Sequence, residues 1–218
     1  DDVITANKKF VREFCKLLIA EPYRVNLLIP NGLRADMVNR EILTLLKDAG
    51  LKSVGFGIET GNERVQKLIK KGITNDRVRE SVKLSKELGL HTWGFFILGL
   101  PGDTEEAIRE TIDFAIELDV KFAKFLILKP FPGSEVYYQL DERGLIDSRD
   151  FGSYGVYMPP VHHLEELTPE RILSLQRMAF RRFYYRPSKI LEHLMDIRSM
   201  TKFGAFCRGV MFIAAQTL

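Results

Sequence analysis

Apolar and polar positions follow two alternating patterns over the first 129 residues of the chain. Short apolar runs rich in Val, Ile, Phe and Leu are typical of strands buried on both faces of a parallel sheet. Between them, apolar residues recur every three or four positions, which is typical of helices packed on one side. The pattern therefore predicts four β-α units joined by short loops. The predicted strands cover residues 24–29, 53–58, 92–98 and 122–128.

The helices expected between these strands carry recognisable start signals. Residues 38–49 form one apolar stripe. Asn62 is a good N-cap for the next helix, and Asn75 or Asp76 can start the one after it. The run Asp103-Thr104-Glu105-Glu106 has the composition of a capping box that opens a further helix. These signals place helix starts where the β-α pattern requires them.

Four consecutive β-α units imply right-handed parallel crossovers. A dinucleotide-binding open sheet would carry G-x-G-x-x-G after its first strand, and that motif is absent. We therefore expect an α/β fold, a partial parallel (β/α) barrel of the TIM type. After Phe131-Pro132-Gly133 the strand signal stops, and Thr168-Pro169 opens a long helix. The expected organisation is a truncated barrel over residues 1–147 and a mostly helical C-terminal region over residues 148–218.

Composition changes this picture little. With 45% hydrophobic and 28% charged residues, and 32 basic against 29 acidic residues, it gives no argument for nucleic acid or an anionic membrane as a partner. The most apolar stretch, residues 209–218, is too short to span a membrane; we expect a packed helix, with a membrane-surface helix as the weaker alternative. The two cysteines, Cys15 and Cys207, have neither disulfide-framework nor metal-ligand spacing, so a cytoplasmic location is expected.

Candidate chemistry lies at the carboxyl ends of the predicted strands, where the βα loops of such folds meet. Glu59 stands out because a carboxylate at the end of a buried strand is costly unless it meets donors. It is either a ligand-binding group, suited to a ribose diol, or half of an ion pair with Arg34 or Lys71. Gly57 and Gly61 flank it and would let another molecule approach the backbone. The residues alone leave both interpretations open.

Other features are weaker. The Gly99–Gly102 run lacks the Gly-Lys-Ser/Thr of a P-loop, so a tight turn is the simpler interpretation. His162-His163 with Glu165-Glu166 could suggest a metal, but adjacent histidines diverge in direction, so we expect no metal site there. The arginines among the aromatic residues of 177–186 could suggest RNA binding. A helix with a solvated basic face and inward aromatics is favoured.

Taken in order, the strand ends resemble the radical S-adenosylmethionine (SAM) superfamily, most closely the branch that carries an upstream cobalamin-binding domain. The likeness covers residues 1–145. The pieces that carry it are Asp1-Asp2-x-x-Thr5, Arg34-x-Asp36, Leu46-x-x-Ala49-Gly50, Gly55-x-Gly57-Ile58-Glu59-Thr60-Gly61, Lys71-Gly72, Phe96-x-Leu98-Gly99-Leu100-Pro101-Gly102-Asp103-Thr104 and Pro130-x-Pro132-Gly133-Ser134. Each piece alone is unspecific; the ordered set is not.

The resemblance implies a role for each matching position. Glu59 would contact the ribose or amino group of SAM, and Lys71 would meet its carboxylate. Arg34 would face the barrel interior near SAM or the substrate. The remaining implied cofactor-binding residues are Gly57, where the backbone can be approached, Leu98 and Gly99, which would line the adenine, and Lys129, Pro130 and Phe131, whose backbone would meet the adenine edge. No catalytic residue is implied.

The family's cluster-binding loop, Cys-x-x-x-Cys-x-x-Cys, is absent from the chain. We therefore expect an N-terminally truncated chain that is inactive alone. The resemblance implies that its full-length parent uses a 4Fe-4S cluster to cleave SAM to a 5′-deoxyadenosyl radical. It would act on a small-molecule substrate, with flavodoxin or ferredoxin as electron donor. The cobalamin branch implies methylation or rearrangement. The alternatives are a cluster-free barrel used for binding or scaffolding, and an ordinary barrel lyase or hydrolase.

Overall fold

The computed structural model of the chain describes residues 4–156, 158–197 and 200–217, so the expected Asp1-Asp2 piece lies outside the described residues. The chain forms two compact units, each built from separate stretches of sequence. The first contains residues 1–59, 70–96 and 117–124, and the second contains residues 60–69, 97–116 and 125–218.

A parallel sheet runs through the fold in the order β1-β2-β3. Its strands are β1 (Ser53–Glu59), β2 (His91–Leu98) and β3 (Phe122–Ile127). β1 and β2 pair in parallel from Ser53↔His91 to Gly57↔Phe95, and the register then shifts just before Glu59. Three of the four predicted strands are therefore present within a residue or two of their expected limits, and the expectation of an α/β fold with a parallel sheet is confirmed.

The predicted strand over 24–29 is wrong as a regular strand. This segment runs beside β1 but pairs only through two isolated parallel bridges, Leu27↔Leu51 and Leu33↔Phe56. Leu27 N–H donates to Gly50 O at 3.1 Å, and Leu33 N–H donates to Gly55 O at 2.7 Å. Between the bridges the chain turns at Pro30, which has no N–H to offer a ladder. The apolar run was correctly identified, but apolarity alone does not supply continuous pairing.

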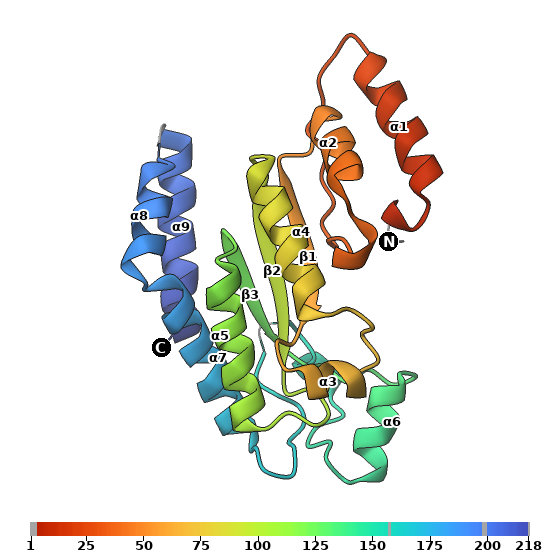
Figure 1. The fold of residues 1–218 in the computed structure, drawn as a ribbon. Helices are drawn as coiled ribbons and strands as arrows, with labels where there is room; N and C mark the ends of the chain where they lie inside the picture. Colours follow the sequence, from red (N-terminus) through yellow and green to blue (C-terminus); the bar gives the residue numbers. More distant parts are fainter. Residues whose placement is uncertain (1–3, 157, 198–199, 218) are drawn as a thin grey trace. The chain divides into compact units, whose positions relative to one another are not determined.

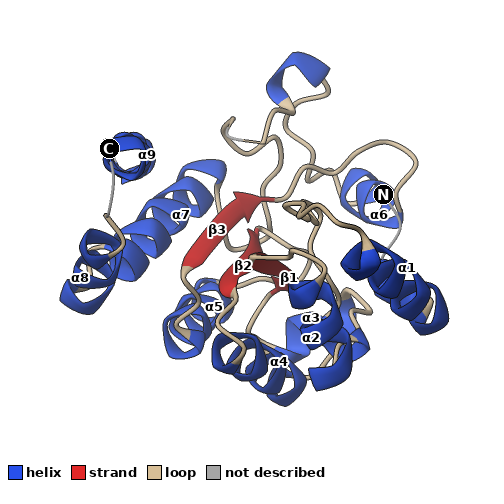
Figure 2. Ribbon diagram, turned by 90° about the horizontal axis from the view of Figure 1, so that it is seen from above, coloured by secondary structure: helices blue, strands red, loops and turns tan. Residues whose placement is uncertain are grey.

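The first unit carries its helices on one face of its strands. They are η1 (Ile4–Ala6), α1 (Lys8–Ala20), η2 (Ala35–Met37), α2 (Arg40–Asp48) and α4 (Asn75–Glu87). α1 packs beside α2 (Figure 1), and α4 packs against β1 (Figure 2). α4 begins at Asn75, as expected, and its N-cap is Thr74, whose hydroxyl accepts from Arg77 N–H at 3.3 Å.

The second unit holds most of the C-terminal residues. Its helices are α3 (Glu63–Leu68), α5 (Glu105–Leu118), α6 (Glu135–Glu142), η3 (Phe151–Ser153), α7 (Pro169–Tyr184), α8 (Pro187–Met195) and α9 (Met200–Thr217). Asn62 caps α3 and Thr168 caps α7, as expected. Phe180 and Phe183 of α7 are buried against Phe125 of β3, with ring centroids 5.4 and 6.1 Å away. The inward aromatic face predicted for this helix is confirmed at Phe180 and Phe183 but not at Tyr185, which is 54% exposed.

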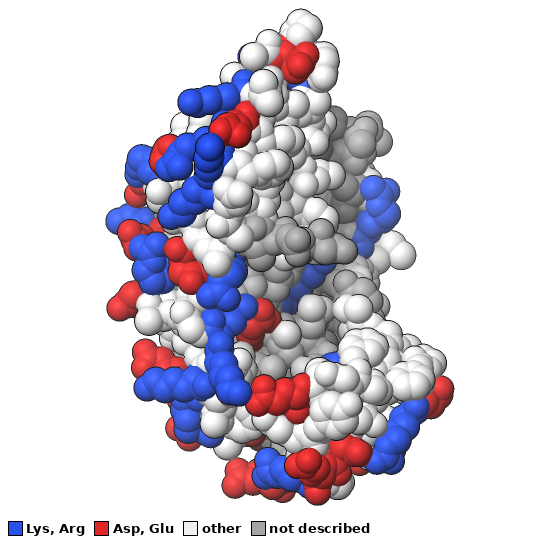
Figure 3. Space-filling view, turned by 90° about the vertical axis from the view of Figure 1, so that its right-hand side faces the viewer, with Lys and Arg blue, Asp and Glu red and all other residues white. Residues whose placement is uncertain are grey.

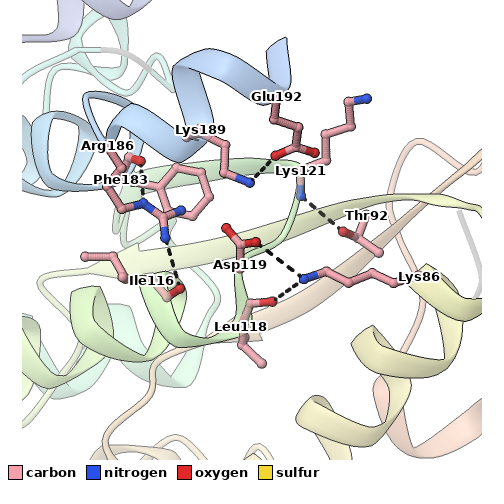
Figure 4. A network of polar contacts seen from close by, with 10 residues as sticks. All are labelled: Lys86, Thr92, Ile116, Leu118, Asp119, Lys121, Phe183, Arg186, Lys189 and Glu192. Carbon is pink, nitrogen blue, oxygen red and sulfur yellow. Dashed lines mark hydrogen bonds and ion pairs between the residues drawn. The ribbon is translucent and has the colours of Figure 1, made fainter. Parts of the chain in front are cut away.

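Arginine and lysine side chains fix the helix junctions of each unit (Figure 4). In the second unit, Arg186 donates from Nε to Phe183 O at 2.9 Å and from Nη1 to Ile116 O at 3.2 Å. This ties the α7–α8 junction to the end of α5. In the first unit, Lys86 Nζ donates to Leu118 O at 3.0 Å. Basic side chains here satisfy carbonyls at a helix end, as helix termini require.

The expected helix near the C-terminus is α9, which packs beside α7. The Phe180 and Phe212 rings meet with centroids 6.3 Å apart. Within the part of the chain that is described, no helix combines the length and the apolar character needed to cross a membrane.

Candidate active site at the strand ends

Glu59 and Lys71 form an ion pair at the carboxyl end of β1. Lys71 Nζ donates to Glu59 Oε1 at 2.6 Å. The side chain of Lys71 is only 17% exposed, and that of Glu59 only 21%. The second interpretation offered by the sequence, an ion pair with Lys71, is therefore present in this structure. The carboxylate and the ammonium are held together, and both remain accessible to solvent. A ligand would therefore meet a negative and a positive charge side by side.

Gly57 makes room for this pair. A Cβ at position 57 would lie 3.0 Å from Glu59 Oε1 and 3.4 Å from Lys71 Nζ. A larger side chain there would press on the carboxylate. The structure thus brings together three of the predicted cofactor residues, Gly57, Glu59 and Lys71.

The backbone around the pair is strained. Glu59 has φ 66° and Lys70 has φ 54°, in the left-handed region that residues with a Cβ seldom adopt. These two residues bound the excursion over residues 60–69, which belongs to the second unit. The Glu59–Lys71 pair therefore joins the two ends of this excursion. Left-handed non-glycine residues cost free energy and concentrate at binding and catalytic sites.

Arg34 does not pair with Glu59. Its guanidinium donates to Asp36 through two parallel bonds, from Nε to Oδ1 at 3.1 Å and from Nη2 to Oδ2 at 3.0 Å. This bidentate bond raises the pKa of Arg34. Arg34 is about one-third exposed and is held in one orientation by its neighbour.

In the second unit, the loop after β2 is organised by Asp103. Its Oδ2 accepts from the N–H groups of Gly99 at 3.0 Å and Leu100 at 2.9 Å. The predicted run opens α5 as expected: Thr104 caps the helix, and its hydroxyl accepts from Ala107 N–H at 3.2 Å. Asp103, the first residue of that run, serves the preceding loop, because a carboxylate before a helix can accept from nearby loop N–H groups as readily as from the following helix turn.

His162 holds the same loop from a distant part of the sequence. Its Nε2 lies 2.8 Å from Gly99 O, and the ring is fully buried. Burial lowers the pKa of His162 and raises the pKa of Asp103 to about 7. Within the described part of the chain, Asp103 Oδ1 and His162 Nδ1 are buried without a hydrogen-bond partner. No local pattern could have joined His162 to Gly99, because 63 residues separate them.

The end of β3 lies beside the end of β2. Leu128 N–H donates to Leu98 O at 2.9 Å, so Leu98 and Gly99 are next to the predicted adenine-edge segment Lys129 to Phe131. Lys129 Nζ donates to Ser153 O at 3.3 Å and Met158 O at 3.1 Å, and also to Pro159 O. Burial lowers the pKa of Lys129. Its side chain is thus engaged with the segment after α6.

Pro130 and Phe131 differ in exposure. Pro130 is buried, whereas Phe131 is 55% exposed. The Phe131 ring lies 5.4 Å from the ring of Tyr154, centroid to centroid. The rigid turn expected here therefore presents an aromatic ring at the end of β3.

The residues of this chain do not fit an iron–sulfur cluster. Cys15 is buried in α1 and Cys207 lies in α9, so the chain cannot offer three thiolates. Among the described residues, no group of three His, Cys, Asp or Glu side chains could hold a metal ion. His163, one of the two adjacent histidines considered above for a metal site, has its Nδ1 2.8 Å from Asp147 Oδ1. On the face in Figure 3, basic and acidic side chains are interspersed.

The chemistry available is recognition of a polar, doubly charged molecule. Glu59 can accept from a diol or an ammonium, and Lys71 can donate to a carboxylate. In the second unit, the backbone at Leu98–Gly99 and Lys129–Phe131 offers hydrogen-bonding groups beside an exposed ring. Each of these two groups of residues, taken by itself, can bind and orient part of a ligand.

Residues 2–115, more than half of the chain, match the family described as the radical SAM superfamily. The chain is 32% identical to an uncharacterized methyltransferase of Pyrococcus horikoshii, over 90% of the chain and 42% of that protein. It is similar to the radical S-adenosylmethionine methyltransferase TsrM of Kitasatospora setae, solved with cobalamin and a [4Fe-4S] cluster (TM-score 0.53, 24% identity, 62% of this chain and 27% of that one). It also resembles coproporphyrinogen III oxidase HemN of Escherichia coli (TM-score 0.58, 16% identity, 82% and 37%). The chain spans less than half the length of each.

Proposed function

Because the chain belongs to the radical SAM superfamily, we propose that it forms the SAM-binding part of an enzyme that cleaves this cofactor reductively. The observation that carries the proposal is the Glu59–Lys71 pair, held in a strained backbone at the end of a parallel strand. When bound, SAM supplies the carbon–sulfur bond whose reductive cleavage starts radical chemistry. Every other role proposed here belongs to the chain's own residues.

Glu59 accepts hydrogen bonds from the ribose or the amino group of SAM, and Lys71 donates to its carboxylate. Their mutual contact at 2.6 Å keeps both groups ready before the ligand arrives, which limits the ordering cost of binding. Gly57 leaves the space beside them open. Arg34, fixed by Asp36, provides a cation near SAM or the substrate.

The adenine is bound by the strand ends of the second unit. Leu98 and Gly99 line it, and the backbone of Lys129, Pro130 and Phe131 meets its edge. Asp103 accepts from the N–H of Gly99 and His162 contacts its C=O, so both backbone polar groups of Gly99 are held. Planar rings are held well by backbone hydrogen bonds along one edge and apolar contact on the face.

The cysteines that would hold a 4Fe-4S cluster are not among the residues of this chain, whose only cysteines are Cys15 and Cys207. We propose that the full-length protein acts on a small molecule, with methyl transfer as the favoured outcome, because a similar protein and a similar structure are described as methyltransferases. Cobalamin is proposed as a further cofactor, because the similar methyltransferase structure was solved with cobalamin bound. An electron donor of the flavodoxin or ferredoxin kind would supply the reducing equivalent. In this proposal, residues 1–147 would form the truncated barrel, and residues 148–218 would form the mostly helical C-terminal region.

Anaerobic reconstitution of the full-length protein with iron and sulfide tests this function. We expect 5′-deoxyadenosine to form from SAM when a reductant is added, and methylcobalamin to support product formation. The gene upstream of the codon for Asp1 should encode Cys-x-x-x-Cys-x-x-Cys in frame. A reconstituted protein that produces no 5′-deoxyadenosine would favour the alternative, a barrel that serves for binding or scaffolding.

A further inference from the structure

The strands of the first unit have one covered face and one half-exposed face. In β2, Thr92, Gly94 and Phe96 are buried, whereas Trp93 and Phe95 between them are only partly covered. β3 repeats the pattern at Phe122, Ala123 and Lys124, where only the middle residue is buried. Side chains two positions apart point to the same face of a strand. The half-exposed face therefore carries Trp93, Phe95, Phe122 and Lys124.

The three aromatic residues form a fixed floor. Trp93 stacks on Phe122 with ring centroids 4.3 Å apart and planes inclined by 24°. The Phe95 ring lies directly on the glycine backbone beside it, because a Cβ at Gly55 would be 2.7 Å from that ring and one at Gly32 would be 3.0 Å from it. Only glycine at these positions lets the ring lie so close. The floor is thus set by close packing and does not depend on a ligand.

Lys124 is the charged group on this floor. Its Nζ lies 5.5 Å from the centroid of Trp93 and 5.5 Å from that of Phe95. Among the described residues, this ammonium has no hydrogen-bond acceptor and no carboxylate partner. The two rings attract the cation through their faces but accept none of its three N–H bonds directly. A partly covered ammonium is therefore left with its donors available.

The register joins this floor to the Glu59 end of the sheet. Gly57 pairs with Phe95 across β1 and β2. The register shifts between Gly57 and Glu59, but a Cβ at Gly57 would lie 3.0 Å from Glu59 Oε1, so the carboxylate reaches the same face. Gly57 is only partly buried, and Gly55, two positions before it, points to the same face but is buried beneath the Phe95 ring. The same face of the first unit therefore carries the proposed SAM contact and the unpaired ammonium.

We propose that the cluster of Trp93, Phe95, Phe122 and Lys124 binds the substrate, and that the substrate is an anion with a planar, apolar body. This rests on the proposed function, and it names the substrate class for the same site. The aromatic floor accepts a planar face by stacking, and the Lys124 ammonium donates to the anionic group. A cationic ligand is disfavoured, because the Lys124 ammonium beside the rings would repel it.

Trp93 is the only tryptophan of the chain, so its fluorescence reports on this cluster alone. We would titrate the whole 218-residue chain with 3-phenylpropionate and, separately, with its uncharged amide 3-phenylpropanamide. The carboxylate should change the Trp93 emission saturably, and the amide should need at least tenfold more ligand. In Lys124→Gln the affinity for the carboxylate should fall about tenfold, to that of the amide. The matched control is Lys47→Gln, an exposed lysine on α2.

The proposal is overturned if the carboxylate and the amide titrate alike, if neither gives a saturable change, or if Lys124→Gln binds as the unaltered chain does. Quenching of the Trp93 fluorescence by iodide provides a second measurement, which does not depend on the binding of a ligand. The quenching constant for iodide should fall in Lys124→Gln, whereas that for neutral acrylamide should not change. These measurements need neither SAM nor a cluster. Their failure is therefore separate from a failure to form 5′-deoxyadenosine, which would overturn the proposed function instead.

Discussion

Lys71 Nζ lies 2.6 Å from Glu59 Oε1, and this contact joins the two ends of the excursion between β1 and α4. An ion pair with each side chain about one-fifth exposed adds at most about 1 kcal/mol to stability. The left-handed backbone at Glu59 costs about the same. The pair therefore gives little net stability, which agrees with the proposed role of Glu59 and Lys71 in binding a ligand.

The first prediction follows from this balance. Glu59→Gln in the full-length protein should weaken SAM binding by about tenfold, since a charge-assisted hydrogen bond contributes about 1.5 to 3 kcal/mol. Its stability should change by less than about 1 kcal/mol. Calorimetric titration with SAM measures the first effect, and urea unfolding the second.

Glu41→Gln is the matched control for that experiment. Glu41 forms an exposed ion pair with Arg12 at 2.6 Å, on a helix surface far along the sequence from Glu59. The Glu41→Gln variant should therefore bind SAM with the same affinity as the unaltered protein. Equal SAM affinity in Glu59→Gln and the unaltered protein would remove Glu59 from the binding site.

Local signals were enough to predict much of this fold. The β1, β2 and β3 strands were found because their apolar runs are short and bounded by turn residues, and Asn62 and Thr168 were found because side-chain caps act within three residues. Segment 24–29 failed for the opposite reason. Regular pairing needs neighbours, and its backbone meets β1 only at Leu27 and Leu33.

The site was predictable as a set of positions but not as a set of contacts. The sequence offered both Arg34 and Lys71 as partners for Glu59, and the choice depends on folding that brings residue 71 back to residue 59. Lys129 was predicted through its backbone, yet its ammonium contacts carbonyls 24 to 30 residues away. Contacts of that range leave no periodic signal in a single sequence.

The second prediction concerns Asp103. Burial raises the pKa of this carboxyl from 3.8 to about 7, so between those values the folded state holds a proton that the unfolded state has released. Its contribution to stability is therefore present below pH 4 and is lost as pH rises to about 7, at about 1.4 kcal/mol per pH unit. Asp103→Asn should remove this slope.

Urea unfolding of both proteins at pH 4.5 and pH 7.5 measures the effect. The unaltered protein should lose a few kcal/mol relative to Asp103→Asn over that interval. All other titrating groups are common to both proteins and cancel in the difference. A difference in stability that is independent of pH would show that Asp103 is already ionised at pH 4.5 in the folded state.

The third prediction concerns the ammonium of Lys129. Lys129→Met keeps the length and the apolar stem but removes the donors to Ser153, Met158 and Pro159, so the segment after α6 should loosen. Loss of these bonds should cost about 1 to 3 kcal/mol. Chymotrypsin should cut after Phe151, which is 64% exposed, several times faster than in the unaltered chain.

Lys83→Met, at an exposed position of α4, provides the comparison. Its cleavage rate should equal that of the unaltered chain. If Lys129→Met were cut no faster than Lys83→Met, the three carbonyl contacts would have no part in ordering this segment.

The last prediction uses one substitution at two places in the second unit, with opposite expected signs. In Gly61→Ala, the new Cβ would lie 2.6 Å from Cβ of the buried Phe114. The overlap involves a backbone-attached atom, so Phe114 cannot escape it by rotating its ring. It should also strain the bond from Gly61 N–H to Thr111 Oγ1, which is 3.0 Å long. We expect a loss of about 1 to 3 kcal/mol.

In Gly209→Ala, the same methyl group is added inside helix α9, where nothing lies within 4 Å of the new Cβ. Alanine is a better helix former than glycine by up to about 1 kcal/mol, so this variant should be more stable than the unaltered chain. Urea midpoints of the two variants compare the effects directly. Since the chemical change is identical, a shift of the same sign in both would mean that packing against Phe114 does not govern position 61. Opposite shifts would establish that the close approach of Gly61 to α5 is a steric requirement of the loop that follows Glu59.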